Sequence, residues 1–198
     1  MKLKILYIIT IIISFFNIAY ASFDSPQFII NQSSNSIKTQ QKIGDILVII
    51  INGVAIGKAI YDKDWDGLTQ YAYVATSTGV LTLGLKYGVN RERPDGDSYS
   101  FPSGHTAFSF AGATFLQMRY GSTWGIPALI GASFVGYSRI ASQRHYTSDV
   151  LAGALIGILT NLYFTKPVAF KMNETTYNMY ITPYVDTTQV KVNFHITL

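Results

Sequence analysis

Three short stretches of the chain combine cationic side chains with imidazoles, which are the residue types that bind and transfer phosphoryl groups. They are Lys86–Pro94, Pro102–His105 and Ser138–Asp149. Lysine and arginine hold phosphate oxygens through charge-assisted hydrogen bonds, and a neutral imidazole can act as a nucleophile or as a proton carrier. Binding of an anion and nucleophilic attack by an imidazole are therefore the first chemistry that these residue types suggest.

The first two stretches each have a second explanation. Lys86 and Arg93 are seven positions apart and are followed by Pro94; two cations at a helix end also complement the helix dipole or lie in solvent. Pro102-Ser103-Gly104-His105 precedes an apolar helical pattern, so free backbone N–H groups there would attract an anion beside His105. An ordinary serine cap followed by a structural histidine is the alternative.

The third stretch places Asp149 four residues after His145. If a helix has begun by His145, the two side chains share a face, and the carboxylate fixes the imidazole tautomer and leaves the other nitrogen free to attack. A surface ion pair is the alternative. Arg91 and Arg144 flank the motif positions, where they either add to a positive field that steers an anion or lie solvated.

Five apolar segments, each interpreted as a helix, must position these side chains. In the third segment, apolar residues recur every three and four positions, the spacing of one helical face. The segments are shorter than the roughly 20 residues of a membrane span, which suits a globular bundle or one that is tilted or partly inserted in a membrane. They are Ile46–Ile60, Leu68–Leu85, Thr106–Met118, Ile126–Tyr137 and Val150–Phe164.

The flanking segments differ from this helical domain, which spans 43–166. Residues 1–21 combine basic residues, an apolar run and an Ala19-Tyr20-Ala21 ending, which predicts a cleaved secretory signal peptide, with an uncleaved anchor as the alternative. Residues 22–42 form a polar lead-in. In 167–198, alternating apolar residues predict a β-hairpin. We therefore expect an exported protein, either periplasmic or membrane-associated with its active site on the periplasmic side.

Composition removes several classes of function. The chain has no cysteine, which excludes disulfides, cysteine nucleophiles and cysteine-ligated zinc. Its net charge is +4 without a run of basic residues, so nucleic acid is not an expected partner. No obvious carboxylate cluster is present to hold a divalent ion, and we expect no metal and no other cofactor.

Together, Lys86-x6-Arg93-Pro94, Pro102-Ser103-Gly104-His105 and Ser138-Arg139-x5-His145-x3-Asp149 resemble the three signature motifs of the type 2 phosphatidic acid phosphatase (PAP2) and haloperoxidase superfamily. All specified positions agree in order and spacing. The resemblance covers residues from about Leu68 to Phe164. It implies an all-α bundle of about five core helices, to which the predicted hairpin would be an extension.

The resemblance also implies a role for each motif residue. His145 would be the nucleophile that forms a phosphohistidine, Asp149 would orient it, and His105 would protonate the leaving group and then activate water. Two imidazoles in opposite protonation states predict a bell-shaped pH dependence with a weakly acidic to neutral optimum. The third histidine, His195, is interpreted as structural or solvated. The phosphoryl oxygens would be held, without a metal, by Lys86, Arg93, Ser103, Gly104 and Arg139.

The substrates that the resemblance suggests are lipid-linked: undecaprenyl diphosphate, phosphatidate or phosphatidylglycerol phosphate, reached at a membrane surface. A soluble periplasmic acid phosphatase acting on small monoesters is the alternative. Aromatic residues near the loops, such as Trp65 and Trp124, could provide an apolar approach for a lipid, but a packed core needs the same residues. A vanadium haloperoxidase would use the same pocket, but the chain is short for one. A structural or transport bundle would not need the complete residue set.

Overall fold

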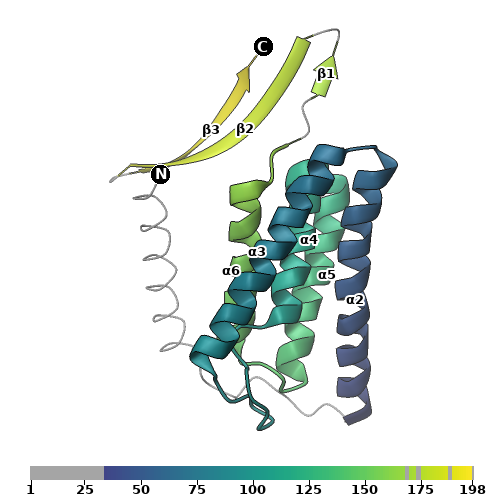
Figure 1. Ribbon diagram of the computed structural model, residues 1–198, viewed down its shortest axis with the longest axis vertical. Helices are drawn as coiled ribbons and strands as arrows, with labels where there is room; N and C mark the ends of the chain where they lie inside the picture. Colours follow the sequence, from purple (N-terminus) through teal and green to yellow (C-terminus); the bar gives the residue numbers. More distant parts are fainter. Residues whose placement is uncertain (1–33, 168–169, 173–174, 187–188, 198) are drawn as a thin grey trace.

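The computed structural model describes residues 34–167, 170–172, 175–186 and 189–197, with side chains through residue 167. Within these residues the chain forms a bundle of five helices, which confirms the predicted all-α core (Figure 1). The predicted signal peptide and most of the polar lead-in lie outside the described residues. The helices are α2 (Ser34–Tyr61), α3 (Trp65–Val89), α4 (Gly104–Tyr120), α5 (Ser122–Ala141) and α6 (Thr147–Phe164).

The helices are longer than the apolar segments that predict them. Helix α2 has 28 residues and begins inside the polar lead-in, and α3 has 25. The side chain of Asp64 caps α3 by accepting from the Gly67 amide, and Asn90 ends it in the left-handed conformation. Caps extend a helix through polar turns that carry no hydrophobic period. The expectation that every helix is shorter than the roughly 20 residues of a membrane span is therefore wrong for α2, α3 and α5, which have 28, 25 and 20 residues.

Helix α4 is the central helix, because it packs against each of the other four (Figure 1). Ala107, Ala111 and Phe115, which belong to the predicted apolar face, are fully buried. Ala113 and Leu116 on other sides are also fully buried. A helix enclosed by neighbours buries most of its circumference, so the single face predicted from spacing underestimates the burial of α4.

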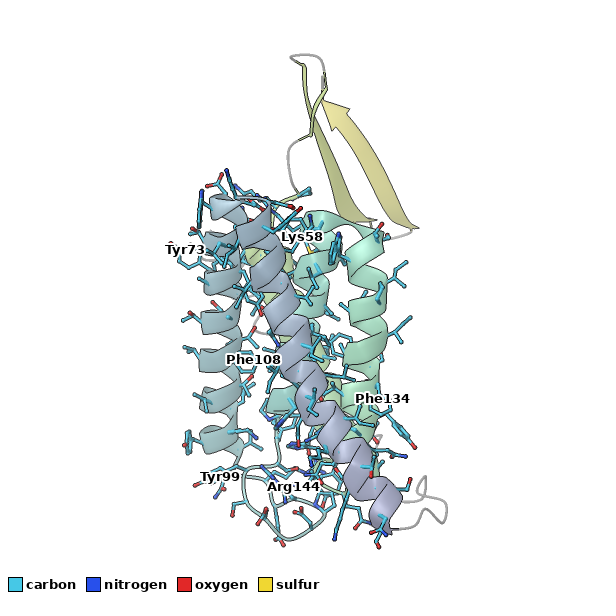
Figure 2. The ribbon with its side chains drawn as sticks, turned by 90° about the vertical axis from the view of Figure 1, so that its right-hand side faces the viewer. Lys58, Tyr73, Tyr99, Phe108, Phe134 and Arg144 are labelled. Atoms are coloured by element: carbon cyan, nitrogen blue, oxygen red, sulfur yellow. The ribbon has the colours of Figure 1, made fainter. Side chains whose placement is uncertain are left out.

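The connections at one end of the bundle bring the three motif stretches together. Helices α3 and α5 end there, and α4 and α6 begin there, at the lower end in Figure 1. Tyr99 and Arg144, which belong to these connections, lie at that end in Figure 2, and Lys58 and Tyr73 lie at the opposite end. We call the first the motif end and the second the far end.

Beyond the bundle, three strands follow: β1 (Phe170–Met172), β2 (Thr175–Asp186) and β3 (Gln189–Thr197). They pair antiparallel in the order β1-β2-β3, and the β2–β3 register runs from Asn178 opposite Thr197 to Asp186 opposite Gln189. Their side chains lie outside the described part of the chain. The predicted hairpin with one apolar face, and the interpretation of His195 on it, stay predictions.

Candidate active site

The start of α4 lies at the motif end and carries the second motif stretch. Ser103 is the N-cap residue, and its backbone N–H donates to the carbonyl of Asp149 at 2.9 Å. Its hydroxyl does not cap the helix; it lies 2.9 Å from the Thr106 hydroxyl and is fully buried. The side chain of His105, in contrast, is about half exposed. Helix α4 begins at Gly104, two residues before the predicted segment that starts at Thr106, and His105 is its second residue.

His145 lies in the α5–α6 connection, where its backbone N–H donates to the carbonyl of Arg139 at 3.3 Å. Helix α6 begins at Thr147, so the condition that it has begun by His145 is not met. The imidazole is buried, and its Nδ1 lies 3.8 Å from Oδ2 of Asp149. Within residues 34–167, Nδ1 has no hydrogen-bond partner. Burial lowers the pKa of His145, which favours the neutral ring.

Asp149 is fully buried and accepts hydrogen bonds from three groups. The Ser100 hydroxyl and the Tyr146 amide donate to Oδ2 at 2.5 and 2.9 Å, and Nη1 of Arg91 donates to Oδ1 at 3.2 Å. The Arg91 guanidinium also lies 3.9 Å from the centre of the Tyr146 ring. Neither earlier explanation of Arg91 describes it, because Arg91 stabilises the Asp149 carboxylate instead of lying in solvent.

Lys86 and Arg93 add positive charge on the α3 side. Lys86 donates from Nζ to the carbonyl of Tyr99 at 2.7 Å. Nε of Arg93 is buried and has no hydrogen-bond partner among residues 34–167. The charge of Lys86 also lowers the pKa of His105 and of His145. The structure therefore brings side chains from all three stretches within electrostatic reach of one another.

Arg144 lies at the surface of the motif end. Its Nη1 donates to Oδ2 of Asp95 at 2.7 Å and to Oδ2 of Asp97 at 2.9 Å. These ion pairs join the α5–α6 connection to the α3–α4 connection. Because two carboxylates face Arg144, it contributes little net positive field, and its role is to hold the two connections together.

Arg139 contacts α2, a helix that carries none of the motifs. The guanidinium donates from Nη1 to Oδ1 of Asp45 at 2.8 Å and from Nη2 to the carbonyl of Gln41 at 2.7 Å. The same Oδ1 of Asp45 lies 3.2 Å from Nε2 of His105. Asp45 and Gln41 were missed by sequence reasoning. A carboxylate in an otherwise apolar helical run is the signal that could have drawn attention to Asp45.

Comparisons with known proteins give a family match and two related phosphatases. The PAP2 superfamily model matches residues 95–172, which contain the second and third motif stretches. The chain is 42% identical over 115 residues to a lipid A 1-phosphatase of Porphyromonas gingivalis, covering 55% of this chain and 25% of that protein. It is 32% identical over 130 residues to phosphatidylglycerophosphatase B of Bacillus subtilis, covering 57% and 62%. The chain thus spans about a quarter of the first relative.

The fold comparison extends further along the chain. A transmembrane PAP2-type phosphatidylglycerolphosphate phosphatase from Bacillus subtilis superimposes with a TM-score of 0.59 at 25% identity, covering 78% of this chain and 92% of that one. The family match ends at residue 172, so it does not include the predicted C-terminal hairpin. A shared helical fold and a family match that includes two of the three motifs lead to one statement: residues 95–172 match the PAP2 superfamily, and the fold resembles that of a PAP2-type phosphatase.

Proposed function

We propose that this protein is a metal-independent phosphatase that hydrolyses a lipid-linked phosphomonoester or diphosphate through a phosphohistidine on His145. The observation that carries the proposal is a buried imidazole with a lowered pKa at a bundle end where Lys86 and Arg93 also lie. A neutral imidazole is a nucleophile, and nearby cations stabilise the charge that develops on phosphoryl oxygens.

The proposed reaction has two steps. In the first, a nitrogen of His145 bonds to phosphorus while the bond from phosphorus to the leaving oxygen breaks, and that oxygen takes a proton from His105. In the second, water gives a proton to His105 and attacks the phosphohistidine, which releases phosphate and restores His145. Asp149 would stabilise the charged imidazole. Holding the phosphoryl oxygens is assigned to Lys86, Arg93, Arg139, Ser103 and the Gly104 amide.

The pH dependence of this reaction follows from two lowered pKa values. Burial lowers the pKa of His145 below its usual 6.5, so the nucleophile stays neutral through the neutral range and is lost by protonation only in acid. Burial and the charge of Arg139 also lower the pKa of His105, which must be protonated to act as the acid. We therefore expect a bell-shaped profile whose optimum lies on the acidic side of neutrality.

The surface of the bundle supports a membrane location and a lipid substrate. Helices α2 and α6 are long and apolar enough to cross a membrane. Large apolar side chains are exposed along the helices, among them Ile49 at 73%, Val80 at 65% and Ile130 at 67%. Soluble monomers rarely expose large contiguous apolar patches, so large apolar side chains exposed on several helices favour a membrane location. The names of the two related phosphatases also support a lipid substrate.

Exposed aromatic residues flank these apolar side chains at both ends of the helices. Tyr61 and Trp65 lie at the far end, and Tyr87 and Tyr99 lie at the motif end. Tyrosine and tryptophan gather at the two interfaces of a bilayer. The 25 residues of α3 extend about 37 Å, enough to cross a hydrocarbon core of about 30 Å. A periplasmic motif end would agree with the predicted signal peptide.

The test is phosphate release by the purified protein in detergent with EDTA present. The panel is phosphatidate, phosphatidylglycerol phosphate, undecaprenyl diphosphate and a soluble monoester, and we expect the lipid phosphates to be preferred. His145→Ala should reduce turnover by about 10³-fold or more, whereas the matched change His195→Ala should leave it near the original value.

Four outcomes would contradict the proposal. Activity that survives His145→Ala would exclude the phosphohistidine, and loss of activity in EDTA would exclude a metal-independent mechanism. Equal or better turnover of the soluble monoester would favour a periplasmic acid phosphatase. Vanadate should inhibit hydrolysis; bromide oxidation in its presence would instead indicate a haloperoxidase.

A further inference from the structure

We propose that Asp45 of α2 is a positioning residue for His105, which it holds in its working arrangement through the carboxylate oxygen that also accepts from Arg139. This inference rests on the proposed function for its consequence, but its geometry is independent of the substrate. Asp45 lies outside the three motif stretches. It reaches the site because α2 crosses the end of α5 at the motif end.

The contacts of Asp45 join three helices at a single atom. Oδ1 accepts from Nη1 of Arg139 at 2.8 Å and lies 3.2 Å from Nε2 of His105. The Arg139 side chain is 3% exposed, whereas Asp45 is 43% exposed. A carboxylate that faces Nε2 favours a proton there and makes Nδ1 the ring nitrogen that exchanges protons with the substrate.

The backbone of α2 is held close at this point, so Asp45 is not a surface residue that meets its partners by chance. Gln41, one helical turn before it, accepts from Nη2 of Arg139 at 2.7 Å. The neighbouring Gly44 is buried, and a Cβ there would lie 2.3 Å from Oγ of Ser138 and 2.7 Å from Nη2 of Arg139. Glycine permits this close approach, which sets the position of the Asp45 carboxylate.

The charges around His105 give Asp45 its chemical effect. Arg139 from α5, Lys86 from α3 and His145 from the α5–α6 connection all disfavour a protonated imidazole, and Asp45 from α2 favours it. Removing the carboxylate would leave the opposing positive charges unbalanced. His105 would then hold its proton less readily and would be a poorer donor to the leaving oxygen.

The experiment compares Asp45→Asn with the original protein on two phosphates that differ in the leaving group. An alkoxide leaves poorly without a proton, whereas 4-nitrophenolate leaves readily. Asp45→Asn should lower kcat for phosphatidate by about tenfold or more but change kcat for 4-nitrophenyl phosphate by no more than about threefold. The alkaline limb of the pH profile should move to lower pH. Asp62→Asn, the same change at the far end, should leave both the kcat for phosphatidate and the alkaline limb unchanged.

A second measurement does not depend on turnover. The Cε1 proton of His105, assigned with His105→Gln, is titrated by NMR, and its midpoint should fall by about half a unit or more in Asp45→Asn. Asp45→Glu keeps the charge and should restore part of the shift. An unchanged midpoint, or equal kcat losses on both phosphates, would overturn the proposal. If neither phosphate is hydrolysed but the midpoint moves, the proposed function fails and the Asp45 contact stands.

Discussion

A buried carboxylate is costly unless hydrogen-bond donors surround it, and Asp149 meets this condition with three donors from different places in the chain. Ser100 belongs to the α3–α4 connection, Arg91 follows α3, and the Tyr146 amide caps α6. Each donor fixes one part of the motif end to the same residue. Asp149 therefore holds the site together in addition to standing 3.8 Å from His145.

At the far end of the bundle, Asp64 is likewise a carboxylate that accepts hydrogen bonds from several parts of the chain. Arg119 donates to both of its carboxylate oxygens, Tyr120 donates to Oδ2 at 2.9 Å, and the Gly67 amide donates to Oδ1 at 3.0 Å. Arg119 also donates to the carbonyl of Lys166 at 2.7 Å, just after α6. These bonds, chiefly that with Arg119, lower the pKa of Asp64 to about 2.

Asp64→Asn should destabilise the protein by about 2 kcal/mol at pH 7. The folded pKa lies below the unfolded value of 3.8, so the stabilisation is complete above pH 3.8 and is lost as the pH falls towards 2. Thermal unfolding in detergent at a series of pH values measures the difference between variant and original. The more exposed Asp62, which pairs with Lys58, provides the control: Asp62→Asn should change stability little. If the loss of stability in Asp64→Asn stayed constant down to pH 2, the loss would come from packing and not from the charge of Asp64.

At the scale of elements, two glycines let α6 approach the central helix α4. A Cβ at Gly153 would lie 2.4 Å from the carbonyl oxygen of Ser103, and one at Gly157 would lie 2.4 Å from that of Ala107. Asn161, one turn further, donates to the carbonyl of Ala111 at 2.9 Å. Small residues four positions apart allow helix backbones to pack closely. The contact also places the start of α6, and hence Asp149, beside Ser103.

Gly157→Ala should destabilise the bundle by about 1–3 kcal/mol, because the new methyl group meets backbone atoms that cannot move aside easily. A melting temperature lower by several degrees in detergent would record this. Gly84→Ala is the matched control, since a Cβ at Gly84 meets no atom within 4 Å. That change should be neutral or stabilising, because alanine is the better helix former. Equal losses in both variants would show that the α4–α6 contact tolerates separation.

For the whole molecule, the arrangement of exposed side chains predicts how the bundle partitions. Apolar residues are exposed along the helices and aromatic residues near both ends, as in a protein that crosses a bilayer. The protein should stay in membranes washed with carbonate and require detergent for extraction. Release by osmotic shock without detergent would contradict this expectation.

Ile130→Lys tests the apolar surface directly, because Ile130 is exposed near the middle of α5. A lysine at the centre of a span costs about 3 kcal/mol, so the yield of protein in washed membranes should fall several-fold. Tyr61→Lys at the end of α2 is the control and should keep its yield, because a lysine there reaches the interface. Equal yields for both variants would place α5 in water.

Much of the site could be predicted from the sequence because the informative signals are local. The motif residues are close neighbours within each stretch, and their types define the chemistry. The helices follow from apolar spacing, although their ends depend on caps such as Asp64. The contact of Arg91 could not be predicted from local spacing, because its partner Asp149 is 58 positions away.

The family motifs, the candidate nucleophile and the five-helix core could be predicted from the sequence, since each rests on residue type and short-range spacing. Which charged groups meet depends on the tertiary structure. Packing of the helices brings Asp45 into contact with Arg139, 94 positions away, and with His105. It also brings Arg91 into contact with Asp149, and Arg144 into contact with Asp95 and Asp97. Such pairs depend on how whole helices cross, because the short side chain of an aspartate contacts a residue far away in the sequence only where packing brings the two backbones close together.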